Sequence, residues 1–417
     1  MENGLFANRK NLHKNIAFYL TLSVAFLLPF KLPVPVLIAL LTLNWLIEGD
    51  FKTKFSGKQK KNYFFLFASF YVLHIIALFY TINIPEGLSA LEVKLSLLIF
   101  PLLFFTTPFN SKQLQAFLKA FIIGCTTAML FCLLRAAYYY FTEGLNYFFY
   151  MELSYFMHPG YFSMYLSLAA FVLLFSLFNR NNLFLNASAK RSYLIALVFI
   201  SLFIVLLSAK LGILVYFSLL MLSVIIEFIY RQKYLLLFGI VAVSVSTLYS
   251  VYQYIPAVRD RFSNLISATA NKEIDKTSSE STTVRILVWG AAQELIKENF
   301  WLGVSPGDTN DRLYREYEKR GYTGAYEHKL NAHNQYYQTF IGLGIVGFLL
   351  MLAQFIFPLV SAVKNKKSIL LVFILLVAFN FSTESMLQTQ SGVIFYTFFN
   401  SLFLFYDWKG TVDLKMS

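Results

Sequence analysis

The sequence predicts an all-α polytopic membrane protein, and three observations indicate this class. Hydrophobic residues make up 58% of the 417-residue chain and charged residues only 14%, which is too apolar for a soluble domain with a polar surface. Long apolar runs recur along the chain, and a helix needs about 17 to 25 such residues to cross a roughly 30 Å hydrocarbon core. The runs do not show the alternating polar and apolar pattern of a membrane barrel, so we interpret them as helices.

About twelve segments are apolar enough to span a bilayer, although several are short or contain proline. In chain order they occupy residues 13–30, 33–48, 62–81, 90–107, 114–141, 160–179, 192–208, 211–229, 234–255, 334–361, 368–383 and 391–407. Residues 256–333 form a long polar interruption. We therefore expect transmembrane helices within residues 1–255, a loop subdomain in residues 256–333, and further transmembrane helices within residues 334–417, all in one integrated domain.

The chain has a net charge of +13, and its basic residues gather on one expected side of the membrane. This distribution argues against a nucleic-acid partner. Lysine and arginine gather in alternate gaps between the apolar segments, such as residues 52–61 and 364–367. The other short gaps have few cations and contain Glu86, Glu143, Glu152 and Glu384. Because cytoplasmic loops are enriched in basic residues, we expect both termini in the cytoplasm and residues 256–333 on the outer side.

Motifs for metals and nucleotide cofactors are lacking, so we expect neither a metal nor another cofactor. Cys125 and Cys132 lie about 10.5 Å apart along one expected helix, which is too far for a disulfide. The sequence contains no cluster of cysteine and histidine typical of zinc sites, and no Gly-rich loop typical of nucleotide phosphate sites.

The polar interruption has an order of its own. Its second half predicts an amphipathic helix on the membrane surface, because Ser281 to Thr283 are good cap residues and the following apolar positions have helical spacing. Arg285 lies on a neighbouring face of this helix. A turn follows in "FWLGVSPGD", and the interruption ends at His333, directly before the next apolar segment.

Two stretches of this region resemble the signature of the O-antigen ligase and polymerase superfamily of bacterial membrane glycosyltransferases. In "TTVRILVWGAAQELIKENFWLGVSPGD", Arg285 opens an aromatic-containing helix that leads to a glycine turn. In "AHNQYYQTFIGLGIVGFLL", His333 and Asn334 open a helix containing Gly344 and Gly347.

Two upstream segments are also similar to this family. In "LLSAKLGIL", Lys210 stands where the family usually has arginine, so a cation is retained but bidentate contact with a phosphate is lost. "MHPGYFSMYL" contains His158 in a His-Pro segment at an expected outer helix start.

The resemblance implies a glycosyltransferase of the GT-C-like membrane type in the bacterial inner membrane, with its active site in the periplasm. Its donor would be a glycan on undecaprenyl diphosphate and its acceptor lipid A-core, as in lipopolysaccharide biosynthesis. A diphosphate leaving group requires cations, which Lys210, Arg259, Arg261 and Arg285 can supply.

His333 is the expected general base, because histidine needs little pKa tuning and the nearby helix N-terminus favours the neutral imidazole. This chemistry predicts a single displacement with inversion at the anomeric carbon and without metal. His158, Asn334 and Tyr337 are candidate substrate contacts.

Several alternatives stay open at the sequence level. A polymerase of the same superfamily would use another carrier-linked glycan as acceptor, and a protein O-oligosaccharyltransferase would use a protein hydroxyl. Interfacial arginines such as Arg259 and Arg261 also bind lipid headgroups, and Tyr337 fits an interfacial aromatic belt. Glu384 either orients a cation or is solvated, and we do not expect it to take part in catalysis. A transporter or lipid flippase is a further alternative, although the unusual polar residues gather at one face.

Overall fold

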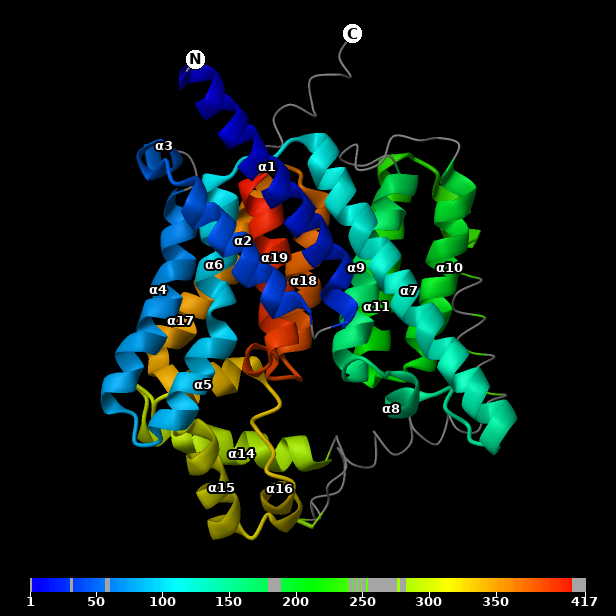
Figure 1. Ribbon diagram of the computed structural model, residues 1–417. Helices are drawn as coiled ribbons and strands as arrows, with labels where there is room; N and C mark the ends of the chain where they lie inside the picture. Colours follow the sequence, from blue (N-terminus) through cyan, green and yellow to red (C-terminus); the bar gives the residue numbers. More distant parts are fainter. Residues whose placement is uncertain are drawn as a thin grey trace.

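The computed structural model describes residues 2–30, 33–56, 61–178, 189–239 and 283–406, together with residues 242, 246, 249, 253, 276 and 277. Every regular element in these ranges is a helix, so the predicted all-α class is confirmed (Figure 1). Arg259 and Arg261 lie outside the described residues.

Helices follow one another through both halves of the chain. The first half contains α1 (Glu2–Leu27), η1 (Leu28–Phe30), α2 (Val34–Glu48), α3 (Phe51–Ser56), α4 (Lys61–Ala77), η2 (Leu78–Tyr80), α5 (Ile84–Lys94), α6 (Ser96–Thr106), α7 (Ser111–Glu143), α8 (Tyr150–Leu153) and α9 (Pro159–Leu177). The second half contains α10 (Lys190–Leu206), α11 (Lys210–Tyr230), α14 (Thr283–Glu298), α15 (Thr309–Arg320), α16 (Thr323–Glu327), α17 (Gln335–Lys364), α18 (Ser368–Phe381), η5 (Met386–Gln388) and α19 (Gln390–Phe405).

Seven helical stretches among the described residues are long and apolar enough to cross a membrane, which agrees with a polytopic membrane protein. They are Arg9–Phe30, Lys61–Tyr80, Ile84–Thr106, Ser111–Glu143, Pro159–Leu177, Lys210–Tyr230 and Gln335–Lys364. Three shorter apolar helices coincide with expected segments, namely α2, α18 and α19. Most of the expected segment 234–255 lies outside the described residues, so the count of twelve stays a prediction.

Local sequence signals explain where two of the long helices begin. The side chain of Asn83 accepts a hydrogen bond from the backbone N–H of Glu86 and thereby caps α5, so this membrane-crossing stretch starts before the expected residue 90. Asn110 and Gln113 form a reciprocal capping box at the start of α7. The left-handed Gly144 then ends α7.

The core of the bundle is built around α9 and α19. Nearly every residue of both helices is buried, which agrees with their being apolar on all sides. Tyr165 of α9 stacks on Phe395 of α19 with ring centroids 4.3 Å apart, and its hydroxyl donates to the carbonyl of Ser391. The other apolar helices surround this pair, and both native cysteines are buried as free thiols on α7.

A separate hydrophobic cluster lies at one end of the bundle, where α14, α15 and α16 form an outer layer (Figure 1). Its buried residues include Val288 and Leu295 of α14, Tyr317 of α15 and Ile341 of α17. Asp308 fastens this layer to the α4–α5 connection, because its carboxylate accepts from the backbone N–H groups of Ile82 and Asn83 at 2.9 and 2.8 Å. The outer helices are therefore held in a fixed place against the membrane helices.

The glycine turn after α14 inserts against a break in α17. Gly344 has φ of 60°, which interrupts the helix, and Gly303 has φ of 72°. The backbone N–H groups of Val304 and Ser305 donate to the carbonyls of Ile341 and Gly342 at 2.8 and 3.0 Å. A Cβ atom on Gly344 would collide with the carbonyl of Trp301, so both the left-handed conformation and the close approach require glycine there.

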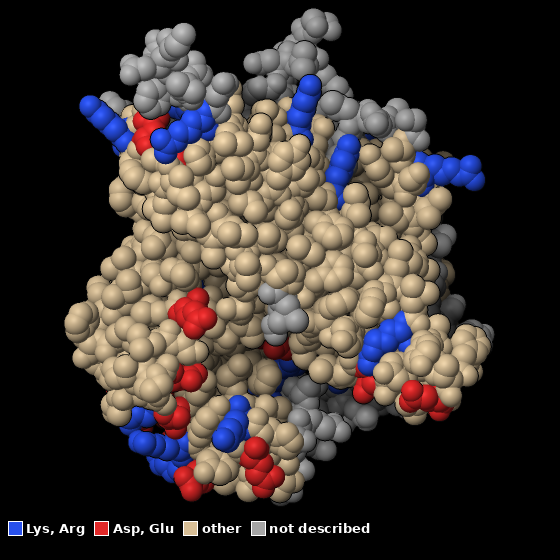
Figure 2. All heavy atoms as spheres, in the orientation of Figure 1, with Lys and Arg blue, Asp and Glu red and all other residues tan. Residues whose placement is uncertain are grey.

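Lysine and arginine are divided between the two ends of the molecule on the face drawn in Figure 2. On the face drawn in Figure 2, lysine and arginine occur at the end that carries the N-terminus of α1 and again at the opposite end, where they mix with acidic residues. A broad band without lysine or arginine separates the two ends on this face. Such a band is the surface expected of helices that contact lipid hydrocarbon.

Candidate functional site

Three ionisable side chains from distant parts of the chain meet beside the outer layer. A terminal guanidinium nitrogen of Arg285 (Nη2) donates to Oε1 of Glu384 at 2.8 Å, and Nδ1 of His333 lies 3.5 Å from Oε2 of the same carboxylate. The side chains of Glu384, Arg285 and His333 are 17%, 23% and 26% exposed. The structure thus brings Arg285 and His333 together, and a carboxylate joins them.

Helix α14 positions Arg285 because another face of this helix is packed in the outer hydrophobic cluster. Val284, Val288 and Ala291 are buried in the outer hydrophobic cluster. Arg285 and Trp289 are four residues apart and therefore project from the same side of the helix. The indole N–H of Trp289 donates to the carbonyl of Ala332 at 3.1 Å, directly before His333.

His333 lies immediately outside helix α17. Its φ of 43° is in the left-handed region, and its backbone N–H donates to the side-chain oxygen of Asn331 at 2.9 Å. Asn334 is the N-cap residue, and its side chain accepts from the backbone N–H of Tyr337 at 3.1 Å. The imidazole is thus set by a sharp turn before the helix, where histidine tolerates positive φ better than most residues.

Glu384 lies in the turn between α18 and η5, and hydrogen bonds hold this turn beside His333. The side-chain amide of Asn334 donates to the carbonyl of Ser382 at 2.9 Å, and its backbone N–H donates to the hydroxyl of Ser385 at 3.2 Å. The backbone N–H of Leu387 donates to the side chain of Gln335 at 2.7 Å. These bonds flank Glu384 on both sides and fix it opposite His333.

The cations around Glu384 control its ionisation. Burial on its own would raise the pKa of this carboxyl, but the contact with His333 and the positive charges of His333, Arg285 and His158 outweigh burial. The pKa of Glu384 therefore lies below its ordinary value of 4.5. At neutral pH the cluster contains a carboxylate that can hold a proton on Nδ1 of His333, which leaves Nε2 as the accepting nitrogen.

Two buried polar atoms of the cluster form no hydrogen bond among the described residues, Nε of Arg285 and Nδ1 of His333. Nδ1 of His333 still faces the Glu384 carboxylate at 3.5 Å, whereas Nε of Arg285 has no such contact. Buried polar atoms in proteins are nearly always paired, so Nε of Arg285 is a place where a ligand or water is expected.

His158 belongs to the same electrostatic neighbourhood. It caps α9 by accepting a hydrogen bond from the backbone N–H of Gly160 at 3.2 Å. Desolvation lowers the pKa of its imidazole from 6.5, the charge of Glu384 acts the other way, and the charges of His333 and Arg285 lower the pKa further. His158 is thus a largely neutral imidazole at neutral pH, and it lies near the His333 cluster.

Lys210 is exposed at the start of α11 and forms no hydrogen bond or ion pair with any residue that the structure describes. The next turn of α11 packs tightly on α9, because a Cβ on Gly212 would collide with the hydroxyl of Ser163. This contact brings the start of α11 to the end of α9 that carries His158.

Asn334 and Tyr337 have structural partners in addition to their place at the site. Asn334 caps α17 and binds the turn before Glu384. The hydroxyl of Tyr337 accepts from the side-chain amide of Gln293 at 3.0 Å, and its ring lies edge-on to Trp289 with centroids 6.2 Å apart.

Figure 2 shows the surface hollowed between the membrane helices and the outer layer, with acidic and basic atoms at depth.

No group of three or more histidine, cysteine, aspartate or glutamate side chains is arranged to hold a metal within the described ranges. Glu384 was expected either to orient a cation or to be solvated, and the structure shows it paired with Arg285. Its sequence signal is weak. Glu384 is one of four acidic residues in cation-poor gaps, and only its pairing with Arg285 across 99 positions distinguishes it.

The long apolar helices define a multi-pass membrane protein, and the polar cluster at one end of the bundle is its candidate site. Residues 195–352 match the sequence model of the O-antigen ligase family. This match confirms the resemblance to the family that the motifs indicated. Arg285, His333 and Lys210 lie within the matched region, whereas His158 and Glu384 lie outside it. No curated protein matches the sequence significantly.

Proposed function

We propose that this protein is an O-antigen ligase-like glycosyltransferase that moves a glycan from undecaprenyl diphosphate to lipid A-core. The reaction would take place on the periplasmic face of the bacterial inner membrane, with both termini of the chain in the cytoplasm. The observation that carries the proposal is the joining of Arg285 and His333 by Glu384, with Arg285 and His333 both inside the O-antigen ligase family match.

In the proposed reaction His333 acts as general base. Glu384 holds the proton on Nδ1, so Nε2 accepts the proton of the acceptor hydroxyl as its oxygen attacks the anomeric carbon. The new glycosidic C–O bond forms while the C–O bond to the diphosphate breaks, and the electron pair leaves with the diphosphate. A single displacement of this kind inverts the configuration at the anomeric carbon.

The leaving diphosphate needs positive charge, and side chains of the protein can supply it. Arg285 uses one nitrogen on Glu384 and retains its unpaired Nε for a phosphate oxygen. Lys210 is a further cation at the same end of the bundle, and Arg259 and Arg261 complete the proposed set. Cations held where charge develops stabilise the transition state. His158, Asn334 and Tyr337 are proposed substrate contacts.

The proposed architecture is a GT-C-like membrane enzyme with about twelve spans, in line with the number of apolar segments. Residues 1–255 and 334–417 would form the membrane part, and residues 256–333 the periplasmic subdomain. The separate hydrophobic cluster of α14 to α16 supports a subdomain of this kind.

An in vitro transfer assay tests the proposal. Purified full-length protein would receive a polyprenyl diphosphate glycan and lipid A-core, and wild type would be compared with His333→Ala, Arg285→Ala and Glu384→Gln. We expect transfer to fall by about 10²- to 10⁴-fold in the His333 variant, since a positioned general base contributes that much. His328→Ala and Arg312→Ala are matched controls, because both residues are exposed on the outer layer.

The outcomes separate the candidate functions. Loss of transfer in the folded site variants, with the controls intact, supports the ligase. Growth of the carrier-linked chain would identify a polymerase, and transfer to a protein hydroxyl an O-oligosaccharyltransferase. Unchanged transfer by His333→Ala would show that His333 is not the general base. Absence of transfer to every acceptor, together with movement of the lipid-linked glycan across vesicles, would indicate a transporter.

A further inference from the structure

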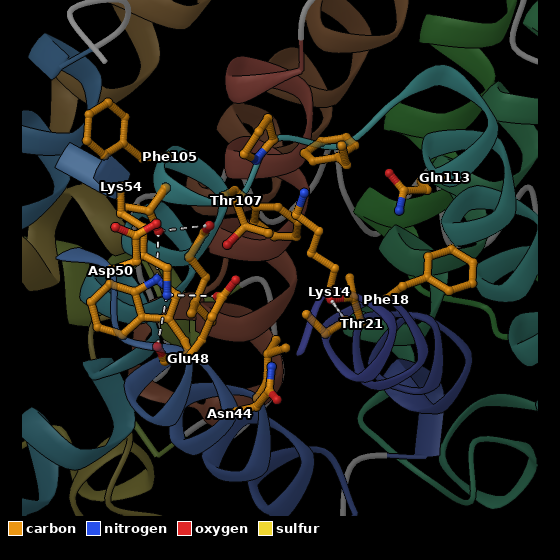
Figure 3. A pocket seen from close by; sticks show the side chains of 18 of the residues that line it. Lys14, Phe18, Thr21, Asn44, Glu48, Asp50, Lys54, Phe105, Thr107 and Gln113 are labelled. Carbon is orange, nitrogen blue, oxygen red and sulfur yellow. Dashed lines mark hydrogen bonds and ion pairs between the residues drawn. The ribbon is translucent and has the colours of Figure 1, made fainter. Parts of the chain in front are cut away.

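A cavity of about 810 Å³ lies at the end of the bundle opposite to the His333 cluster. It opens between α1, α2, α6 and α7, and the connection before α7 forms part of its wall (Figure 3). The outer layer of α14 to α16 is at the other end of the molecule (Figure 1), so this cavity is separate from the proposed active site.

The cavity has the depth of one membrane leaflet. Along α1 its lining extends from Lys10 to Thr21, and this stretch is about 16 Å long at a rise of 1.5 Å per residue. A hydrocarbon core is roughly 30 Å thick, so the cavity reaches from one membrane surface to about the middle of the bilayer. The space therefore suits a molecule with one polar end and a long apolar part.

The deeper walls are apolar and largely aromatic. They are lined by Phe18, Leu41, Leu103, Phe104 and Phe117. Such walls offer contact to hydrocarbon chains and few hydrogen bonds to a polar solute.

The charged groups at the mouth are paired with one exception. Lys54 contacts Glu48 at 2.8 Å with both side chains nearly buried, and Lys10 contacts Asp50 at 3.0 Å. Lys14 extends into the cavity from α1, away from the Glu48 and Lys54 pair on the side of α2 (Figure 3). It forms no ion pair or hydrogen bond with any part of the chain that the structure describes. One positive charge is thus left for a ligand.

We propose that this cavity binds an anionic phospholipid from the leaflet on the side of the chain termini, with its phosphate at Lys14 and its acyl chains along the aromatic wall. A zwitterionic lipid would also bring an ammonium group, but both nearby carboxylates already have lysine partners. Basic pockets between membrane helices on the cytoplasmic side are a general form of anionic lipid site. The proposal does not depend on the glycosyltransferase activity.

Lipid retention by the purified full-length protein tests this site. The protein would be exchanged into nanodiscs of phosphatidylglycerol and phosphatidylethanolamine, released into mild detergent, and its bound lipids counted by native mass spectrometry. We expect wild type to retain phosphatidylglycerol in preference to phosphatidylethanolamine. Lys14→Gln should reduce this preference at least fivefold, while Lys14→Arg should keep it, because the phosphate needs the positive charge.

Two further variants make the result specific to the cavity. Lys112→Gln removes an exposed cation at the start of α7 that does not line the cavity, so it should leave lipid retention unchanged. Thr107→Trp should fill the cavity and displace the lipid while Lys14 is still present. Equal phosphatidylglycerol retention by wild type and Lys14→Gln would overturn the proposal, as would a preference for phosphatidylethanolamine or the absence of any retained lipid.

Discussion

Glu384 contacts both other ionisable side chains of the site. One of its carboxylate oxygens lies 2.8 Å from Nη2 of Arg285, and the other lies 3.5 Å from Nδ1 of the His333 imidazole. Removal of a single partner from a largely buried ion pair costs more than the pair contributes, because it leaves an uncompensated charge in a poorly solvated place. The Glu384 carboxylate therefore has a structural role. In the proposed reaction it also orients the general base, His333.

The lowered pKa of Glu384 predicts a pH-dependent contribution to stability. Since its folded-state pKa lies below the ordinary 4.5, the unfolded state binds more protons at acid pH. Its contribution is complete above pH 4.5 and is lost as the pH falls through the lowered pKa. We expect Glu384→Gln to be less stable than wild type by about 1 to 3 kcal/mol at pH 7. This difference should shrink at pH 3.

Thermal unfolding of both proteins in detergent, at the two pH values, measures this difference. Glu294→Gln is the matched control, because the side chain of Glu294 is 39% exposed on the same outer layer and pairs with the exposed Lys297 across one turn of α14. Its melting temperature should stay close to that of wild type at both pH values. If the melting temperatures of wild type and Glu384→Gln differed equally at pH 7 and pH 3, the difference would not come from the ionised form of Glu384.

At the scale of elements, the contact between the glycine turn and the break in α17 connects the outer layer to the membrane helices. Backbone groups from Phe300 to Ser305 bond with those from Ile341 to Ile345. These bonds satisfy polar groups that the break at Gly344 would otherwise leave unpaired, because an interrupted helix loses internal hydrogen bonds. The contact also determines how α14, and with it Arg285, lies relative to the start of α17.

Gly344→Ala should therefore destabilise the protein and reduce glycan transfer together. The new Cβ would meet the carbonyl of Trp301, and the backbone has φ of 60°. Strain of this kind costs about 1 to 3 kcal/mol. Gly290→Ala is the control, because nothing lies within 4 Å of a Cβ there. In the middle of helix α14, that change should stabilise by about 0.5 to 1 kcal/mol.

Melting temperature and transfer rate of the two variants, measured in the same detergent, check this prediction. A Gly344→Ala protein as stable and active as Gly290→Ala would show that the turn and the helix break are not coupled.

Hydropathy predicted the helices well, because a bilayer requires long apolar segments whatever the tertiary contacts are. The motifs also predicted that Arg285 and His333 belong to one site, and the structure places both on the same carboxylate. The sequence left open whether Glu384 orients a cation or is solvated, because hydrogen bonds between Asn334 and the turn around Ser382 bring this residue to the site. Contacts of this kind depend on tertiary packing and leave no local pattern.

For the whole molecule, the two ends have different chemistry. One end carries α14 to α16 and the His333 cluster, and the other carries the cavity beside Lys14 and the N-terminus of α1 (Figure 1). Glycan transfer from a lipid carrier and the proposed binding of an inner-leaflet lipid therefore require opposite sides of one membrane. Both proposals therefore require the same orientation of the chain in the membrane.

Cysteine labelling tests this orientation. Both native cysteines are buried, so a single introduced cysteine should dominate the reaction with a membrane-impermeant maleimide. Lys319→Cys, at an exposed position of α15, should be labelled in intact spheroplasts, because the positive-inside asymmetry predicts that the outer layer lies in the periplasm. Lys112→Cys, at the start of α7, should be labelled only after the membrane is disrupted. Labelling of Lys112→Cys but not Lys319→Cys in intact spheroplasts would invert the chain, and a donor glycan in the periplasm could then not reach His333.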